Sequence, residues 1–166
     1  MGKRIKGVKD SGWNKNFKKV LGELAKLDAK ELHVGFSADG ADTDEAGKPN
    51  IAQIAAWNEF GTTSKNGNEH IPARPFMRNA FDNNKEAIEA YMAQMFEQVA
   101  MGNMTADEAL ENIGTFQAEL IRHEIEAGDF VENDPRTIER KERKGSSKPL
   151  IDTGRMRQSV QHVIKG

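Results

Sequence analysis

The chain has 166 residues, of which 37% are hydrophobic, 30% charged and 7% aromatic, and its formal net charge is −2. This length suits one domain, and no apolar run approaches the ~20 residues that a membrane-spanning helix needs. The charged first residues lack the apolar stretch of a signal peptide, and the absence of cysteine excludes disulfides, thiolate metal sites and thiol nucleophiles. We therefore expect one domain, assembled in the cytoplasm, whose modest core is completed by contacts with other subunits.

The charges are unevenly distributed along the chain. Residues 1–20 carry seven basic groups and one acid, residues 86–134 twelve acids and one base, and residues 136–148 six bases and two acids. Separated blocks of opposite sign can dock head to tail with further copies or with partners of matching polarity. The alternative is that each block is a solvated face or a mobile end. The near-neutral total argues against a dedicated duplex-binding protein, but a DNA-binding module that uses residues 1–20 stays an alternative.

The N-terminal third is expected to hold an arm, a helix, a strand and a loop. Residues 1–12 are basic and contain three glycines, which is typical of a flexible arm. Apolar residues recur at steps of three and four over residues 13–27 and predict an amphipathic helix. Alternating apolar residues predict a strand over residues 31–38, and the polar residues 38–49 that follow indicate an exposed loop.

A short helix is expected next. Asn50 and Gln53 are placed to form a capping box for a helix over residues 51–60. Gly61 is placed to end this helix in the left-handed conformation. The polar residues 62–70 predict a second exposed loop.

Two long helices follow, the first over residues 78–101 and the second from Thr105 to Ala127. Thr105 and Glu108 predict a capping box at the start of the second helix. The expected buried faces carry Phe81, Ile88, Met92, Met95 and Val99 in the first helix, and Leu110, Ile113, Phe116 and Leu120 in the second.

The C-terminal part is expected to hold an irregular segment followed by a more structured end. Residues 132–148 are charged and predict a third exposed segment of low order. Asp152 is placed to cap a single helical turn, and residues 159–164 alternate as a last strand does. Because no regular βαβ alternation occurs, residues 13–166 predict one α+β domain, a small and mostly antiparallel sheet packed by three to four helices.

Motifs for catalysis, cofactors and metals are largely missing. No histidine pair has the spacing of a helical zinc site, and the acids between Asp39 and Glu45 depart from a calcium-loop pattern. No nucleophile motif and no nucleotide-binding glycine motif is present. We therefore expect no catalytic residue, no metal and no cofactor.

One enzymatic alternative remains. Glu139 and Lys141 have the E-x-K form of restriction-type nucleases, in which a carboxylate holds Mg²⁺ and a lysine stabilises developing charge. Asp129 or Asp134 would supply the upstream acid. A three-residue pattern within so charged a run is weak support, and no apolar strand surrounds it to bury a metal.

The block from Ile54 to Phe81 has unusual content for a connection between helices. Trp57 and Phe60 place bulky aromatic side chains beside a loop. Pro72 and Pro75 bracket Arg74, and because each proline restricts the residue before it to extended geometry, this segment is expected to be a stiff strut that aims Arg74 in a set direction.

Arg78 is expected in the first turn of the following helix, where the helix dipole disfavours a cation. An arginine at such a position is explained by a partner carboxylate. That carboxylate is either on another chain or, in an internal salt bridge, Glu59.

At this block the sequence resembles a known family. The run W-N-E-F-G-T at residues 57–62, followed by I-P-A-R-P-F-M-R-N-A at residues 71–80, is similar to the signature of tail-completion and head–tail joining (neck) proteins of tailed bacteriophages. The run K-P-L-I-D-T-G-R-M-R-Q-S-V at residues 148–160 is similar to the closing motif of the same group. The arm and residues 105–128 match nothing in that pattern.

The resemblance implies a structural virion protein with an α+β fold that assembles as a ring, commonly a hexamer, at the head-proximal end of the tail. It implies no catalytic residues, and partners that are further copies of the chain and neighbouring neck, connector and tail-tube proteins, with DNA passing through the lumen without specific binding. A tail terminator or minor tail protein is the nearest alternative. The positions that carry over as motif or interface residues are Trp57, Glu59, Phe60, Gly61, Pro72, Arg74, Pro75, Phe76, Arg78, Asp152, Gly154 and Arg155. Among these, Arg74 is expected to act between subunits, so that Arg74→Ala leaves the monomer folded and weakens ring formation.

Overall fold

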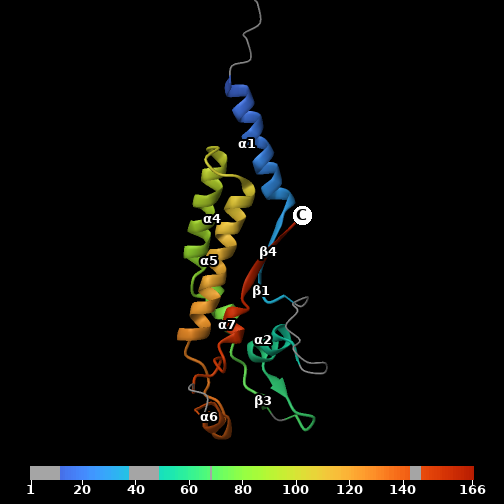
Figure 1. Cartoon of the computed structure of the whole chain (residues 1–166), viewed down its shortest axis with the longest axis vertical. Helices are drawn as coiled ribbons and strands as arrows, with labels where there is room; N and C mark the ends of the chain where they lie inside the picture. The colour runs from blue at the N-terminus through green and yellow to red at the C-terminus, as the bar shows by residue number, and fades with distance from the viewer. Residues whose placement is uncertain (1–11, 38–48, 68, 143–146) are drawn as a thin grey trace, which may run out of the picture.

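The structure is α+β, as the sequence predicts. This computed structural model describes residues 12–37, 49–67, 69–142 and 147–166, so the predicted arm and most of the predicted loop at residues 38–49 lie outside the described part (Figure 1). Within the described residues there are seven helices and four short strands. In chain order they are α1 (Gly12–Ala29), β1 (Glu31–Gly35), α2 (Ile51–Phe60), β2 (Thr62–Thr63), β3 (Glu69–Ile71), α3 (Phe76–Asp82), α4 (Lys85–Ala100), α5 (Ala106–Ala127), α6 (Pro135–Glu142), α7 (Arg155–Gln158) and β4 (Gln161–Lys165).

The long helices α4 and α5 lie side by side as a hairpin, and the C-terminal half of α1 packs against both (Figure 1). The buried centre of this bundle contains Met95, Val99, Ala109 and Ile113. Leu24 and Leu27 of α1 pack against that cluster. The apolar stripe of the first helix therefore packs against α4 and α5 through Leu24 and Leu27 of its second half. None of the described helices has the length and apolar character that crossing a bilayer requires.

The predicted helix starts at Asn50 and Thr105 are both confirmed as capping boxes. The side chain of Asn50 accepts a hydrogen bond from the amide of Gln53 at 2.8 Å, and the side chain of Gln53 accepts one from the amide of Asn50 at 3.1 Å. The Glu108 carboxylate accepts a bond from the amide of Thr105 at 2.8 Å, and the Thr105 hydroxyl accepts one from the amide of Glu108. Each box satisfies amides that a helix start leaves without an internal partner.

The predicted helix over residues 78–101 is in fact two helices. The first turn of α3 begins at Phe76, and the helical conformation is interrupted between Asp82 and Lys85. At the break the side-chain amide of Asn84 donates to the carbonyl of Ala80 at 2.8 Å, because short polar side chains compete with the helical ladder for backbone groups. The break turns Phe81 away from the core, so that 51% of its surface is exposed, and its predicted place on the buried face is wrong.

The strands form two separate antiparallel pairs, so the expectation of one sheet is wrong. β1 pairs with β4 in the register Glu31 to Lys165, and β2 pairs with β3 as a small hairpin inside the predicted loop at residues 62–70. Helix α5 contacts both strands of the β1–β4 pair. Leu32, Val34, His162 and Ile164 are the half-buried residues of this pair, while the opposite face is exposed to solvent.

Helix α5 approaches β4 closely at Gly114. A Cβ atom at this position would lie 2.5 Å from the imidazole ring of His162. The ring is held in place by a contact of 2.7 Å between its Nε2 atom and the Glu111 carboxylate. The missing side chain of Gly114 therefore sets the distance between the helix and the strand pair.

The N-terminus of α5 joins α1 to the bundle through carboxylates. Glu23 accepts a hydrogen bond from the amide of Ala106 at 2.9 Å and an ion-pair bond from Lys26, and Asp107 pairs with Lys30. The bond from Lys26, and then the amide of Ala106, lower the pKa of Glu23. The pKa of Asp107 is also lowered, in this case mainly by its bond from Lys30.

We predict that Gly114→Ala destabilises the protein while Gly22→Ala does not. Alanine is favoured over glycine in a helix by roughly 1 kcal/mol, and Gly22 in α1 is an open site, where an added Cβ atom would meet nothing within 4 Å. At Gly114 the clash with His162 should outweigh that gain, and overpacking of this kind costs about 1–3 kcal/mol. Urea denaturation of both variants tests the contrast. Equal stability of the two variants would contradict the close approach.

We also predict that acid weakens the attachment of α1 to α5. Because the pKa of Glu23 and Asp107 is lowered in the folded protein, their contribution to stability is present above the ordinary values of 4.5 and 3.8 and is lost as the pH falls through the lowered values. The urea midpoint should therefore fall as the pH is lowered below ~4. Glu23→Gln should flatten this dependence, whereas the control Glu97→Gln, on an exposed part of α4, should leave it unchanged.

Candidate protein-interaction surface

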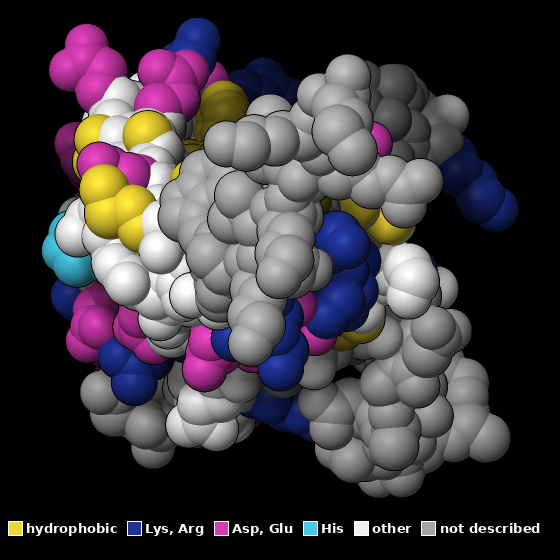
Figure 2. All heavy atoms as spheres, turned by 90° about the horizontal axis from the view of Figure 1, so that it is seen from above, with side chains coloured by type: hydrophobic (Ala, Val, Ile, Leu, Met, Phe, Trp, Pro, Cys, Tyr) yellow, Lys and Arg dark blue, Asp and Glu magenta, His cyan; other side chains and the backbone are white. Residues whose placement is uncertain are grey.

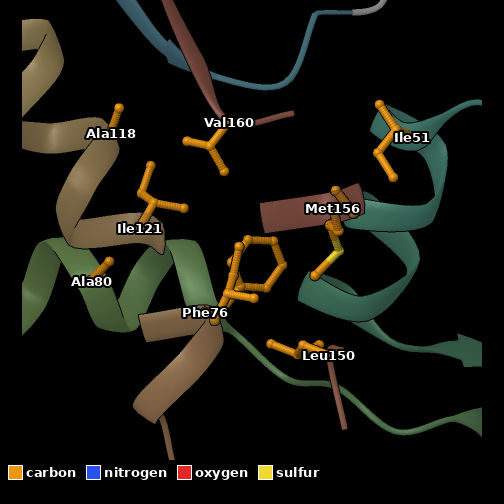
Figure 3. Close-up of a cluster of buried hydrophobic side chains, with 10 residues drawn as sticks. Ile51, Phe76, Ala80, Ala118, Ile121, Leu150, Met156 and Val160 are labelled. Carbon is orange, nitrogen blue, oxygen red and sulfur yellow. The ribbon is translucent and has the colours of Figure 1, made fainter. Parts of the chain in front are cut away.

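The two segments that carry the family resemblance meet in one hydrophobic core (Figure 3). Phe76, at the start of α3, is fully buried at its centre. Ile51 of α2 and Met156 of α7 approach it from one side, and Ile121 of α5 lies on the other. Residues 57–80 and 148–160 are distant in sequence, yet their apolar side chains belong to the same cluster.

Glu59 links the end of α2 to the start of α3. Its side chain is only 6% exposed, and its carboxylate accepts hydrogen bonds from the amides of Met77 at 2.9 Å and Arg78 at 3.2 Å. These amides belong to the first turn of α3, where helix geometry leaves them without internal partners and where the dipole favours a negative charge. The Glu59 carboxylate therefore binds the backbone amide of Arg78, and the side chain of Arg78 is exposed to solvent.

The proline segment, which the sequence predicts to be a stiff strut, bends at Pro75. Pro75 has φ −75° and ψ 62°, and the amide of Phe76 donates to the carbonyl of Arg74 at 2.7 Å, which together make an inverse γ-turn. Gly61 allows the segment to pass close to the end of α2, because a Cβ there would lie 2.9 Å from the carbonyl oxygen of Ile71 and from the amide nitrogen of Ala73. The helix ends at Gly61 as predicted, and the φ of this residue, 71°, favours glycine, but its ψ of 172° departs from the predicted left-handed helical conformation.

The structure corrects the predicted role of Arg74. Its side chain is 4% exposed and lies inside its own subunit. The guanidinium donates to the carbonyl of Val131 at 2.8 Å, to the carbonyl of Glu132 at 3.2 Å, and to side-chain oxygens of Asn58 and Asn133. Arg74 therefore fixes the chain that leaves α5 against the end of α2, and these internal contacts give no basis for the expectation that Arg74→Ala leaves the monomer folded and acts on ring formation alone.

Two aromatic side chains of α2 remain on the surface. Phe60 is 70% exposed and Trp57 is 41% exposed, although α2 is otherwise anchored by its buried residues. Beside them an open groove of about 650 Å³ runs between α2 and the exposed face of the β1–β4 pair. Its walls are largely apolar and include Ala52, Ala56 and Phe60 on one side, Val163 on the other and Met77 between them.

The C-terminal motif residues are placed differently from the prediction. Asp152 is exposed, and the residue that precedes α7 as its N-cap is Gly154, with φ 76° and ψ −1°. A glycine suits this left-handed position, and Asp152 is therefore not the cap. Arg155 begins the helix and is half-buried. This turn carries Met156 into the core around Phe76.

The segment predicted to be of low order contains helix α6, so that prediction is wrong for Pro135–Glu142. Lys141, the lysine of the nuclease alternative, is 5% exposed, and its ammonium group donates to the carbonyls of Lys148 and Pro149. These contacts hold the C-terminal end of α6 to the backbone of Lys148 and Pro149, which is a structural role. Within the described residues no group of three or more histidine, aspartate or glutamate side chains is arranged to hold a metal ion.

Sequence reasoning missed the partners of Arg74 and most of the groove. The guanidinium of Arg74 donates to the backbone carbonyls of Val131 and Glu132 and to the side-chain oxygen of Asn133. A backbone acceptor leaves no signal in the sequence, because every residue has a carbonyl. The groove has a weak signal, since Ala52 and Ala56 are spaced by four and put small residues on one face of α2.

Comparison of the chain with family models, with curated proteins and with solved structures found no significant match. Any statement about function therefore rests on the sequence motifs and on the described geometry. It offers a rigid, apolar and partly aromatic surface suited to contact with another protein.

We predict that Arg74→Ala destabilises the monomer by about 2–4 kcal/mol, because buried hydrogen bonds from a charged donor are lost and their acceptors stay buried. Urea denaturation measures this change. Arg78→Ala is the matched control, since its side chain is exposed and surface substitutions usually stay within about 0.5 kcal/mol. A loss of stability no greater in Arg74→Ala than in Arg78→Ala would rule out the internal role of Arg74.

Proposed function

We propose that the protein is a structural component of a tailed-phage virion, a tail-completion or head–tail joining (neck) protein that assembles with copies of itself into a ring. The proposal rests on the two motifs of residues 57–80 and 148–160. The single observation that carries it furthest is that these motifs pack around Phe76 and leave Phe60 exposed in the wall of an apolar groove, with Trp57 also exposed on the same helix. A tail terminator or minor tail protein shares this support.

The arrangement suits a mechanical role without chemical turnover. A repeated contact around an axis uses two different surfaces of each subunit, and both must be held rigidly so that the ring closes. Here the buried Glu59 and Arg74 fix the segment that carries the aromatic surface. The ring then interlocks with the adjacent connector and tail-tube proteins through its exposed loops.

The acidic helices give this proposal an electrostatic component. Residues 82–126, which are all described and form the end of α3 together with α4 and α5, carry ten acidic and two basic side chains. Seen from the end where α1 begins, acidic side chains gather on the α4–α5 side (Figure 2). Such a surface facing the lumen would repel the phosphate backbone of DNA and let it slide without specific binding.

We predict that Phe60→Asp abolishes head–tail joining without unfolding the subunit. Phe60 is 70% exposed, so a charged side chain at this position leaves the core intact. An apolar partner surface that covers this position would have to bury the charge, which weakens the contact. A phage lacking its own copy of the gene is complemented with either version, and particles are imaged by negative-stain microscopy. Wild-type protein should restore joined particles with the subunit at the neck, and Phe60→Asp should yield separate heads and tails.

The matched control is Val131→Asp, since Val131 is an apolar residue that is 61% exposed and lies outside the groove. It should join particles as the wild type does. Normal joining by Phe60→Asp, or wild-type subunits located anywhere other than the neck, would refute the proposal.

A further inference from the structure

The tip of the β2–β3 hairpin is an exposed turn. The amide of Gly67 donates a hydrogen bond to the carbonyl of Ser64 at 2.9 Å, and this bond closes the turn. Residues 63–67 are exposed, and a Cβ atom at Gly67 would meet nothing within 4 Å. Figure 1 shows the hairpin extending away from the helices α4 and α5. The described part of the chain therefore leaves this turn open to solvent.

This turn contains the one Asn-Gly pair of the sequence, Asn66 and Gly67. Asparagine is among the chemically labile residues of proteins, because the amide nitrogen of the next residue can attack its side-chain carbon and close a succinimide ring. The reacting atoms belong to adjacent residues, so the attack has the advantage of an intramolecular reaction. Glycine favours it most, since it has no Cβ atom to obstruct the attack and its backbone reaches more conformations than that of other residues.

Asn66 also differs from most asparagines of the protein in how its side chain is held. Within the described residues no hydrogen bond holds the side-chain amide of Asn66. By contrast, the amide of Asn103, in the turn between α4 and α5, donates to the side chain of Gln98 at 3.0 Å, and the residue that follows it is Met104. Hydrogen bonds also hold the side chains of Asn50, Asn58, Asn79, Asn84, Asn112 and Asn133.

The hydrogen bond of the Gly67 amide has to open before its nitrogen can react. The hairpin around it is short, since β2 has two residues and β3 three, and a register shift interrupts their pairing. A two-stranded hairpin is at best marginally stable by itself in water, and exposed elements of this kind open locally at small cost. The turn therefore gives the reacting groups a freedom that a helix or a packed strand would deny them.

We infer that Asn66 is a site of spontaneous deamidation through a succinimide. Hydroxide or a buffer base removes the amide proton of Gly67, and the nitrogen forms a bond to the Cγ atom of Asn66. The bond from Cγ to the side-chain nitrogen breaks, and that nitrogen leaves as ammonia with a proton from the solvent. Water then adds to one of the two ring carbonyls and opens the ring. Opening on one side gives aspartate and on the other isoaspartate, and no oxidant or reductant takes part.

Both products change what the hairpin presents to a partner. Each adds one negative charge beside Lys65. Isoaspartate also adds one methylene group to the main chain, which displaces the Gly67 amide from the Ser64 carbonyl. Among the described residues the two hydrophobic clusters include none from this hairpin, so the modification should leave the fold intact. The inference is independent of the proposed function, because it uses only the chemistry of the turn.

Mass spectrometry of peptides from the whole chain tests this inference. The purified protein is incubated in a mildly alkaline buffer made with water enriched in heavy oxygen. It is then digested by pepsin in acidified ordinary water, where the reaction is slow because amides keep their protons. Peptides with Asn66 should exchange the amide –NH₂ for heavy –OH roughly tenfold or more faster than peptides with Asn103, which corresponds to a barrier lower by about 1.4 kcal/mol. Part of the product should be isoaspartate, which electron-based fragmentation distinguishes from aspartate.

Gly67→Asp is the matched variant. Aspartate tolerates the left-handed φ of 78° at this position better than most residues, but its Cβ atom obstructs the attacking nitrogen. The variant should slow the reaction at Asn66 by roughly tenfold or more, while Asn103 reacts as it does in the wild type. An unchanged rate at Asn66 in the variant, similar rates at Asn66 and Asn103 in the wild type, or a product that contains aspartate alone would each overturn the inference.

Discussion

Two buried ionic side chains control the part of the molecule that carries the candidate surface. Burying a charge is costly unless hydrogen bonds replace its hydration, and both Glu59 and Arg74 have such bonds with backbone or amide groups. Glu59 fixes the first turn of α3 to the end of α2, and Arg74 fixes the same end to the chain beyond α5. Because Arg74 lies only two residues before Phe76, the hydrogen bonds and the hydrophobic core constrain the same short segment.

This constraint explains how exposed aromatic residues can keep a defined position. Trp57 and Phe60 lie in the same helix turn as Glu59, which is anchored by the first turn of α3. A side chain on a fixed backbone loses less conformational freedom when a partner covers it, and that lowers the entropic cost of association. In the proposed assembly the rigid junction would therefore favour binding, although none of its buried groups needs to touch the partner.

Local interactions determine the parts of the fold that can be predicted from the sequence. The capping boxes at Asn50 and Thr105 involve residues three apart, and the apolar periodicity of α1, α4 and α5 reflects one packed face per helix. Features set by distant partners are beyond such reasoning. The pattern around Arg74 suggests an intersubunit residue because its acceptors, 57–59 residues away, include backbone carbonyls, and Lys141 resembles a catalytic lysine because its carbonyl partners are equally invisible in sequence.

The two surfaces of the chain differ in how firmly each is held. The groove lies over the rigid junction, whereas the N-terminal half of α1 is a single helix held to the body through its C-terminal half and through Glu23 and Lys30. An isolated helical segment of this length is marginally stable in water, so packing of its apolar face contributes strongly to its order. The order of α1 therefore depends on the packing of Leu24 and Leu27 against α4 and α5 and on the bonds of Glu23 and Lys30 to the start of α5.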